Sequence, residues 1–299
     1  MMELSLLTAI MDLISSTVRL ATPLIFAALG GFFSERSGVI NIALEGKMLI
    51  GAFAAAAVAH WTGSPWLGLV AGGLAGTLLA GVYAGVTINA QADQIVAETG
   101  INMLAMGLVP FLAKAFYGVT GSTPPLAMEE RFQLAPPLIA LGLALLLPVW
   151  FKKTRSGLWV TFAGEHPLAL QAAGVSVRKM RWVSVLLAGF LAGVGGASLS
   201  VFLASGYARN MTAGRGFIAL AALIFGKWRP IPVVLSCLFF GLTDALQMRL
   251  QGVAVEGLGV VPVQFIQILP YIVTLFVLGG FVGRASAPSA LGQGDTAKG

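Results

Sequence analysis

The chain has 299 residues, of which 57% are apolar and only 10% carry a charge, and its mean hydropathy is +0.89. Soluble domains carry a charge on about 25% of their residues, so this composition excludes a soluble globular protein and predicts a polytopic membrane protein. The net charge of +6 requires no nucleic-acid partner, because basic residues retained on the cytoplasmic side of a membrane produce such an excess.

The apolar stretches predict an all-α bundle of eight to nine transmembrane helices, because each spanning helix needs about 20 mostly apolar residues. Residues 1–16 contain two acidic residues and are typical of an interfacial helix. We expect eight spans and one short apolar segment at 217–226; the spans lie at residues 17–33, two within 48–92, 100–118, 132–151, 182–208, 231–250 and 257–283. One membrane domain would cover residues 1–286, and the polar tail 287–299 is predicted to be disordered.

Two places predict a break in a helix near the membrane. One lies at residues 38–46, and the other lies at 212–217, just before the short apolar segment. Broken or re-entrant helices are tolerated in a bilayer only where they face protein or a water-filled cavity. Both breaks are therefore candidates for lining a transport pathway.

The longest polar interruption, residues 152–181, carries six of the eighteen Lys and Arg residues. Pro167 suits the first turn of a helix, and Gly174 suits the position just past its end. Glu165 lies on the N-terminal side, where a negative charge favours the helix dipole. The predicted helix, 167–173, has only two turns and is not stable alone in water. It must therefore dock against other helix ends of this chain or against a partner.

The distribution of basic residues predicts the orientation in the membrane. If the short segment crosses and the 152–181 loop is cytoplasmic, twelve of the eighteen Lys and Arg residues lie inside. The positive-inside rule favours this arrangement over its inverse. The N-terminus would then lie outside and the C-terminus in the cytoplasm.

Three polar residues at the first break are candidates for a substrate pathway. Ser37, Asn41 and Glu45 follow one another at intervals of four, so on a helix they would form one polar stripe that hydrogen-bonds a polar substrate. The alternative is a helix start at the membrane interface, with Ser37 or Asn41 as its cap and Glu45 stabilising its dipole.

Three further residues in apolar stretches are pathway candidates. Asn102 would either line a path or bond a neighbouring helix. Asp244 lies deep in a predicted span, where a carboxylate is a functional candidate, although it would equally pair with a charge on another helix. Phe217 is either a packing residue or a platform on which a base stacks.

No enzyme motif is present in the sequence. It has no nucleotide-binding loop, metalloprotease motif or serine-hydrolase motif. Its two histidines are far apart and have no cysteine or carboxylate cluster beside them, so neither a metal nor a cofactor is expected. The chain is predicted to be a transport protein, and an ATP-driven step would need a separate ATPase chain. The alternative is a stand-alone secondary transporter or channel with Glu45 or Asp244 as its ion-coupled group.

Four stretches of the sequence resemble a known family. They are TPLIFAALGGFFSERSGVINIALEGKMLIGAF at 22–53, QADQIVAETGINMLAMGL at 91–108, GEHPLALQAAGV at 164–175 and GRGFIALAALIFGKWRP at 214–230. They are similar to permease subunits of nucleoside-type ABC importers, within the ribose/branched-chain amino acid permease superfamily. The sequence departs from that pattern at Lys47, where an apolar residue is expected, and at Glu98, where a small one is expected.

The resemblance implies a permease that imports nucleosides across the bacterial inner membrane, with monosaccharides as the alternative substrates. It also implies three partners: a cytoplasmic ATPase with two cassettes in one chain, a second related permease and an extracytoplasmic binding protein. The ATPase would be contacted through the cytoplasmic coupling helix and the residues around it, which are Gly164, Glu165, His166, Pro167, Ala172, Ala173 and Gly174.

Overall fold

The computed structural model describes residues 2–251, 254–255, 259–260, 268, 272 and 286–294. Apart from one antiparallel pair of two-residue strands, β1 (Ala254–Val255) and β2 (Gly259–Val260), the regular structure of these residues is helical. The prediction of an all-α protein is therefore confirmed for the described part of the chain. The predicted span at residues 257–283 lies outside it, apart from four residues.

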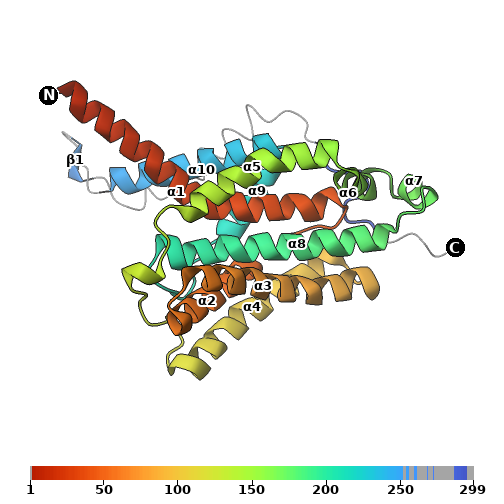
Figure 1. The fold of residues 1–299 in the computed structure, drawn as a ribbon, viewed down its shortest axis with the longest axis horizontal. Helices are drawn as coiled ribbons and strands as arrows, with labels where there is room; N and C mark the ends of the chain where they lie inside the picture. The colour runs from red at the N-terminus through yellow and green to blue at the C-terminus, as the bar shows by residue number, and fades with distance from the viewer. Residues whose placement is uncertain are drawn as a thin grey trace.

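The helices pack side by side as an elongated bundle (Figure 1). Their bounds are α1 (Met2–Arg36), α2 (Leu44–Thr62), α3 (Pro65–Ala84), α4 (Gln94–Tyr117), α5 (Ala135–Lys153), α6 (Arg155–Glu165), α7 (Pro167–Ala172), α8 (Val177–Ser198), α9 (Arg215–Phe225) and α10 (Pro230–Leu250). Two π-helical turns, Gly85–Asn89 and Leu199–Leu203, extend α3 and α8, and a 3₁₀ turn, Met128–Glu130, precedes α5.

Within the described residues, six helical segments are long and apolar enough to cross a membrane. They are Leu7–Arg36, Pro65–Asn89, Gln94–Tyr117, Met128–Lys153, Val177–Leu203 and Pro230–Leu250. The predicted short segment is present as α9. The separate interfacial helix predicted for residues 1–16 is wrong, because α1 runs without interruption from Met2 to Arg36.

Small residues let α8 approach its neighbours closely at the centre of the bundle. A Cβ atom on Gly196 would overlap the carbonyl oxygen of Met48 in α2, and one on Gly193 would overlap that of Gly72 in α3. Close backbone approach of this kind is how helices pack in lipid, where the hydrophobic effect does not drive association. The Gly-rich stretches of α2, α3 and α8 therefore form the interior of the bundle.

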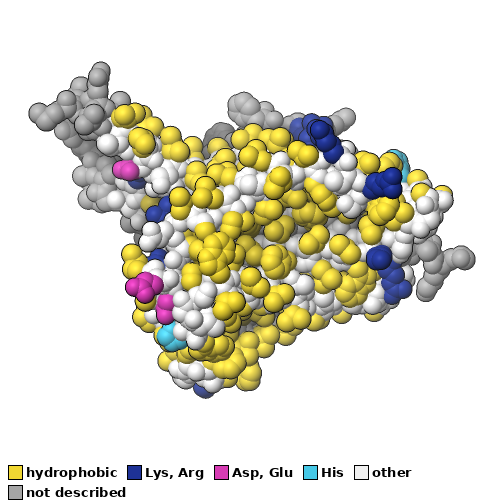
Figure 2. Space-filling model, in the orientation of Figure 1, with side chains coloured by type: hydrophobic (Ala, Val, Ile, Leu, Met, Phe, Trp, Pro, Cys, Tyr) yellow, Lys and Arg dark blue, Asp and Glu magenta, His cyan; other side chains and the backbone are white. Residues whose placement is uncertain are grey.

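The two ends of the bundle differ in charge. Helices α6 and α7 lie at one end, beside the segment 286–294, and α1 begins at the other end (Figure 1). On the face drawn in Figure 2, the larger groups of Lys and Arg side chains lie at the α7 end, whereas acidic side chains are visible toward the opposite end. Residues 287–294 belong to the tail predicted to be disordered, and Ala290 within this part of the tail is buried.

Candidate functional site: a helix break held by side chains

The first predicted break is present in the interior of the bundle. Helix α1 ends at Arg36 and α2 begins at Leu44, and the seven residues between them are not α-helical. The Ser34 hydroxyl donates to the Val39 carbonyl at 2.9 Å, and the backbone turns at Gly38 with φ +94°. The hydrogen bonds of a continuous helix are therefore missing in this stretch, and other groups must replace them.

The expected polar stripe of Ser37, Asn41 and Glu45 is wrong, because the three residues do not share a helix. Ser37 lies just beyond α1, Asn41 in the break and Glu45 in the first turn of α2. The Ser37 hydroxyl donates to the Ser34 carbonyl at 2.7 Å. The interval of four residues thus carried no information here, since the helical period applies only to continuous helix.

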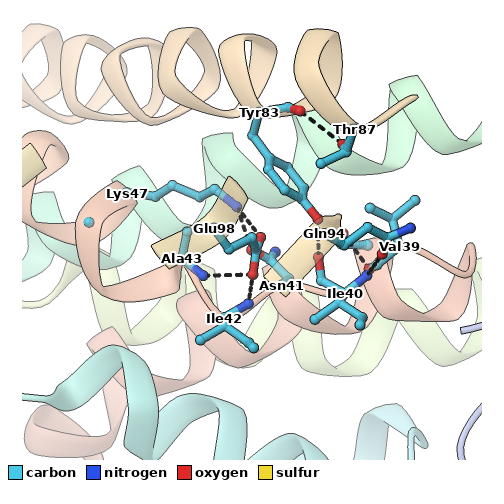
Figure 3. A network of polar contacts seen from close by, with 12 residues as sticks. Val39, Ile40, Asn41, Ile42, Ala43, Lys47, Tyr83, Thr87, Gln94 and Glu98 are labelled. Atoms are coloured by element: carbon cyan, nitrogen blue, oxygen red, sulfur yellow. Dashed lines mark hydrogen bonds and ion pairs between the residues drawn. The ribbon is translucent and has the colours of Figure 1, made fainter. Parts of the chain in front are cut away.

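Polar side chains on one face of α4 accept hydrogen bonds from backbone amides that would otherwise bond within a helix (Figure 3). Gln94, Glu98 and Asn102 lie at positions i, i+4 and i+8 of α4, so their side chains project from the same face of that helix. Each of them accepts hydrogen bonds from the backbone of the break or of the first turn of α2. The donors are Ile40 N to Gln94 Oε1 at 2.9 Å, Ala43 N to Glu98 Oε2 at 2.9 Å, Ile42 N to the same oxygen and Gly46 N to Asn102 Oδ1 at 2.8 Å.

Lys47 and Glu98 form an ion pair in the middle of this site. Lys47 Nζ lies 3.3 Å from Glu98 Oε1, and both side chains have an exposed fraction of 0%. Lys47 also donates to Asn41 Oδ1 and lies 5.0 Å from the centre of the Tyr83 ring. Two buried charges with this many partners compensate each other, whereas either one alone would be costly. The two residues at which the sequence departs from the pattern implied by the resemblance are therefore partners of each other.

Glu45 connects the first break to the second. Its Oε1 accepts from Gly214 N at 2.9 Å, and its Oε2 accepts from Gly216 N at 2.7 Å. These amides belong to the start of α9, where helical N–H groups have no partner within the helix and a negative charge is favoured. Glu45 thus lies in the first turn of α2, as the alternative interpretation predicted, but stabilises the start of α9.

Glu35 connects the same break to the turn between α9 and α10. Trp228 Nε1 donates to Glu35 Oε2 at 2.6 Å, and Asn41 N lies 3.4 Å from Glu35 Oε1. Glu35, Gln94 and Glu98 were not among the predicted site residues. The signal that would have found the last two is their spacing with Asn102, which places three polar groups on one face of an otherwise apolar helix.

The remaining pathway candidates lie apart from this network. Phe217 in α9 has 48% of its surface exposed. Asp244 in α10 is half-buried and interacts electrostatically with Arg215 of α9. Within the described part of the chain, no hydrogen bond links either residue to the break, and no three His, Cys, Asp or Glu side chains are grouped as metal ligands would be.

The predicted two-turn helix is present as α7, one residue shorter than expected. Pro167 occupies its first turn. Past its end, Gly174 has φ +78°, and its amide and that of Val175 donate back to the Gln171 and Leu170 carbonyls at 2.9 and 3.2 Å. This is the glycine-terminated helix end that the sequence predicted.

Helix α7 docks on other parts of the same chain through one side only. Leu170 is buried and packs in a small cluster with Ala163 of α6 and Val177 of α8. The opposite side is exposed, including Ala172 and Ala173. The inner side of α7 thus packs against other parts of the same chain, and its outer side has no partner among the described residues.

The turn before α7 contacts the first break directly. Glu165 is the last residue of α6, and its Oε1 pairs with Arg36 Nη1 at 2.9 Å. A Cβ atom on Gly164 would overlap the Arg36 carbonyl oxygen, so the α6 backbone touches the end of α1. The prediction from the helix dipole did not include this ion pair, which joins residues 129 positions apart.

Six helical segments long and apolar enough to cross a membrane, packed with a side-chain-supported break between α1 and α2, define the described part of the chain as a multi-pass membrane protein. Residues 13–278 match the model of the family described as branched-chain amino acid transport system / permease component, and the chain belongs to this family.

Three relatives show where the chain lies within this family. It is 38% identical to the guanosine ABC transporter permease protein NupQ of Bacillus subtilis, over 94% of this chain and 95% of that protein. It is 39% identical to the nucleoside ABC transporter permease protein NupC of Lactococcus lactis, over 91% of this chain and 92% of that protein. A putative glucose ABC transporter permease protein of Haloferax volcanii is 33% identical, over 94% and 96%. No solved structure matches.

Proposed function

We propose that this chain is the membrane permease of an ATP-binding-cassette importer that takes up nucleosides. The observation that carries this proposal is its identity of 38–39%, over nine-tenths of its length, to two permeases named for guanosine and nucleoside transport. Monosaccharide import is the second candidate, favoured by the 33% identity to a putative glucose permease. A shared fold alone does not fix the ligand, so the ranking rests on this difference in identity.

Three partners complete the proposed importer. Because the sequence of this chain contains no nucleotide-binding loop, ATP would be hydrolysed by a separate cytoplasmic ATPase with two cassettes. That ATPase would dock on the outer side of α7, which is exposed. A second related permease would complete the membrane part, and an extracytoplasmic binding protein would deliver the substrate. The exposed side of α7 supports the first of these assignments, and the similarity to ABC permeases supports all three.

The proposed orientation places the α7 end in the cytoplasm of a bacterial cell and the start of α1 outside. The larger groups of Lys and Arg at the α7 end support it, because such residues are retained on the cytoplasmic side (Figure 2). With α2, the short α9 and the stretch 257–283 added to the six long segments, the domain would have nine segments in the membrane.

The proposed coupling route runs from α7 to the first break. Movement of α7 would be passed through the Glu165–Arg36 ion pair to the end of α1, and from there to the residues that α4 holds. A stretch held by side chains can shift without unwinding a helix, since its hydrogen bonds are not part of a helical ladder. The substrate pathway is therefore proposed to be controlled by Ser37, Asn41, Glu45 and Asn102. Phe217 and Asp244 would contribute to the same pathway from α9 and α10.

The proposal predicts ATP-dependent nucleoside uptake by proteoliposomes that contain the whole assembly with its binding protein. Excess unlabelled guanosine should abolish uptake of labelled guanosine, and excess pentose or glucose should not. Liposomes that contain this chain without the ATPase should take up none. Uptake by the chain alone would instead identify a secondary transporter or channel, and competition by sugar alone would identify the second candidate.

A further inference from the structure

The segment 286–294 connects the turn before α7 to the first break. Ala290 N donates to the Gly164 carbonyl at 2.8 Å, and Gly292 N donates to the Gly38 carbonyl at 3.1 Å. The Ser289 hydroxyl donates to the Glu165 carbonyl. A stretch near the C-terminus is thus bonded both to the α6–α7 turn and to the break, beside α6 in Figure 1.

Burial and backbone geometry hold this segment in place. Ala290 is only 3% exposed. Arg181 Nη1 at the start of α8 donates to the Gln293 carbonyl at 3.1 Å, so a third helix end is attached. Gly292 has φ +77°, and a Cβ atom there would lie 3.0 Å from Ile40 Cδ1 of the break. These contacts make the segment an integral part of the folded structure at the α7 end.

A cavity of about 600 Å³ lies between this segment and α7. It is lined by His166, Pro167 and Leu168 on one side and by Ser289, Ala290 and Gln293 on the other. Leu168 is an apolar residue outside the long apolar helices, yet 70% of its surface is exposed. Most of the lining carries no charge, and the Glu165 carboxylate at its edge is already paired with Arg36. The cavity therefore suits an uncharged, apolar side chain from a partner.

We propose that residues 289–293 and α7 form one composite docking surface for the ATPase subunit, and that an apolar side chain of the ATPase enters the cavity between them. This inference rests on the proposed function and adds a second contact element to it. Because the segment is bonded to Gly38 and to Gly164, a force applied at the cavity reaches the break by two routes, through α7 and through the segment.

Two matched pairs of variants test the role of the segment in the complete assembly. Deletion of residues 286–299 should lower substrate-stimulated ATP hydrolysis by about fivefold or more, whereas deletion of 295–299 should not. Ala290→Asp should act like the longer deletion, because it places a charge at a buried site. Gly294→Asp should match the unaltered chain, because a Cβ atom there meets open space. If the longer deletion does not fold, the second pair decides.

Cross-linking distinguishes docking from a merely structural role of the segment. Gln293→Cys should form a cross-link to an ATPase with surface cysteines, and Gly121→Cys, exposed in the α4–α5 connection at the opposite end of the bundle, should not. Equal cross-linking from both positions, or unchanged hydrolysis in the longer deletion and in Ala290→Asp, would overturn the composite surface alone. An ATPase that is neither retained nor stimulated by the intact chain would overturn the proposed function and this inference together.

Discussion

At the scale of single residues, the Lys47–Glu98 pair explains how charges are tolerated inside this bundle. Each residue was noted in the sequence as a separate departure from the pattern that the resemblance implies, with no link between the two. In the fold, Lys47 Nζ and Glu98 Oε1 are 3.3 Å apart and completely buried. Glu98 also accepts the Ala43 amide, so its removal affects the start of α2 as well as the charge balance.

The pair predicts a non-additive response to substitution. Glu98→Gln and Lys47→Met should each lower the free energy of unfolding by about 3–5 kcal/mol, because each leaves the other charge buried and unpaired. The double variant should be more stable than either single variant, because it leaves no buried charge without a partner. The carbonyl oxygen of the introduced glutamine would still accept the Ala43 amide. Equilibrium unfolding of the purified protein in detergent measures all three. Strictly additive losses would contradict the proposed dependence of one charge on the other.

At the scale of helices, small residues decide how closely α8 approaches α2 and α3. The Gly196 Cα faces the Met48 carbonyl with no room for a methyl group, and a similar approach occurs between Gly193 and Gly72. Gly-rich stretches in a membrane protein indicate close packing of helices, because small residues let their backbones approach. They do not indicate which helices meet, because each glycine shows only that one face of its own helix lacks a side chain.

Gly196→Ala should therefore separate α8 from α2 and cost about 1–3 kcal/mol, the range for overpacking a tight interior. Gly107→Ala in α4 is the matched control, because a Cβ atom at Gly107 meets nothing within 4 Å. The control should keep or slightly raise stability, since alanine is the better helix former. Thermal unfolding in detergent compares the two, and equal effects would mean that the α2–α8 contact is not limiting.

Also at this scale, the helix break limits what periodicity can predict. Its position near Gly38 to Gly46 was readable from the sequence, whereas the stripe of Ser37, Asn41 and Glu45 was not real. A period of 3.6 residues applies only where the backbone stays helical. The genuine stripe lies on α4, at Gln94, Glu98 and Asn102, because that helix is continuous.

At the scale of the whole molecule, the proposed orientation can be tested with single cysteines. The natural Cys237 is buried, so an impermeant thiol reagent should give little background. In cells expressing the chain without an ATPase, Gly121→Cys should react from outside in intact cells, and Ala172→Cys should react only in inverted vesicles. Both positions are exposed and lie outside the long apolar segments. The reverse pattern would place α7 outside and remove the proposed ATPase site.

Composition, hydropathy and the Pro167–Gly174 spacing were sufficient to predict an all-α membrane protein with a two-turn helix in its central loop, because these are local properties of the chain. Only the tertiary structure decided that Glu98 holds the break, that Glu45 caps α9, that Glu165 pairs with Arg36 and that residues 286–294 pack beside α7. Each of these contacts joins segments far apart in sequence. Their geometry depends on how the helices pack, which no local pattern of residues contains.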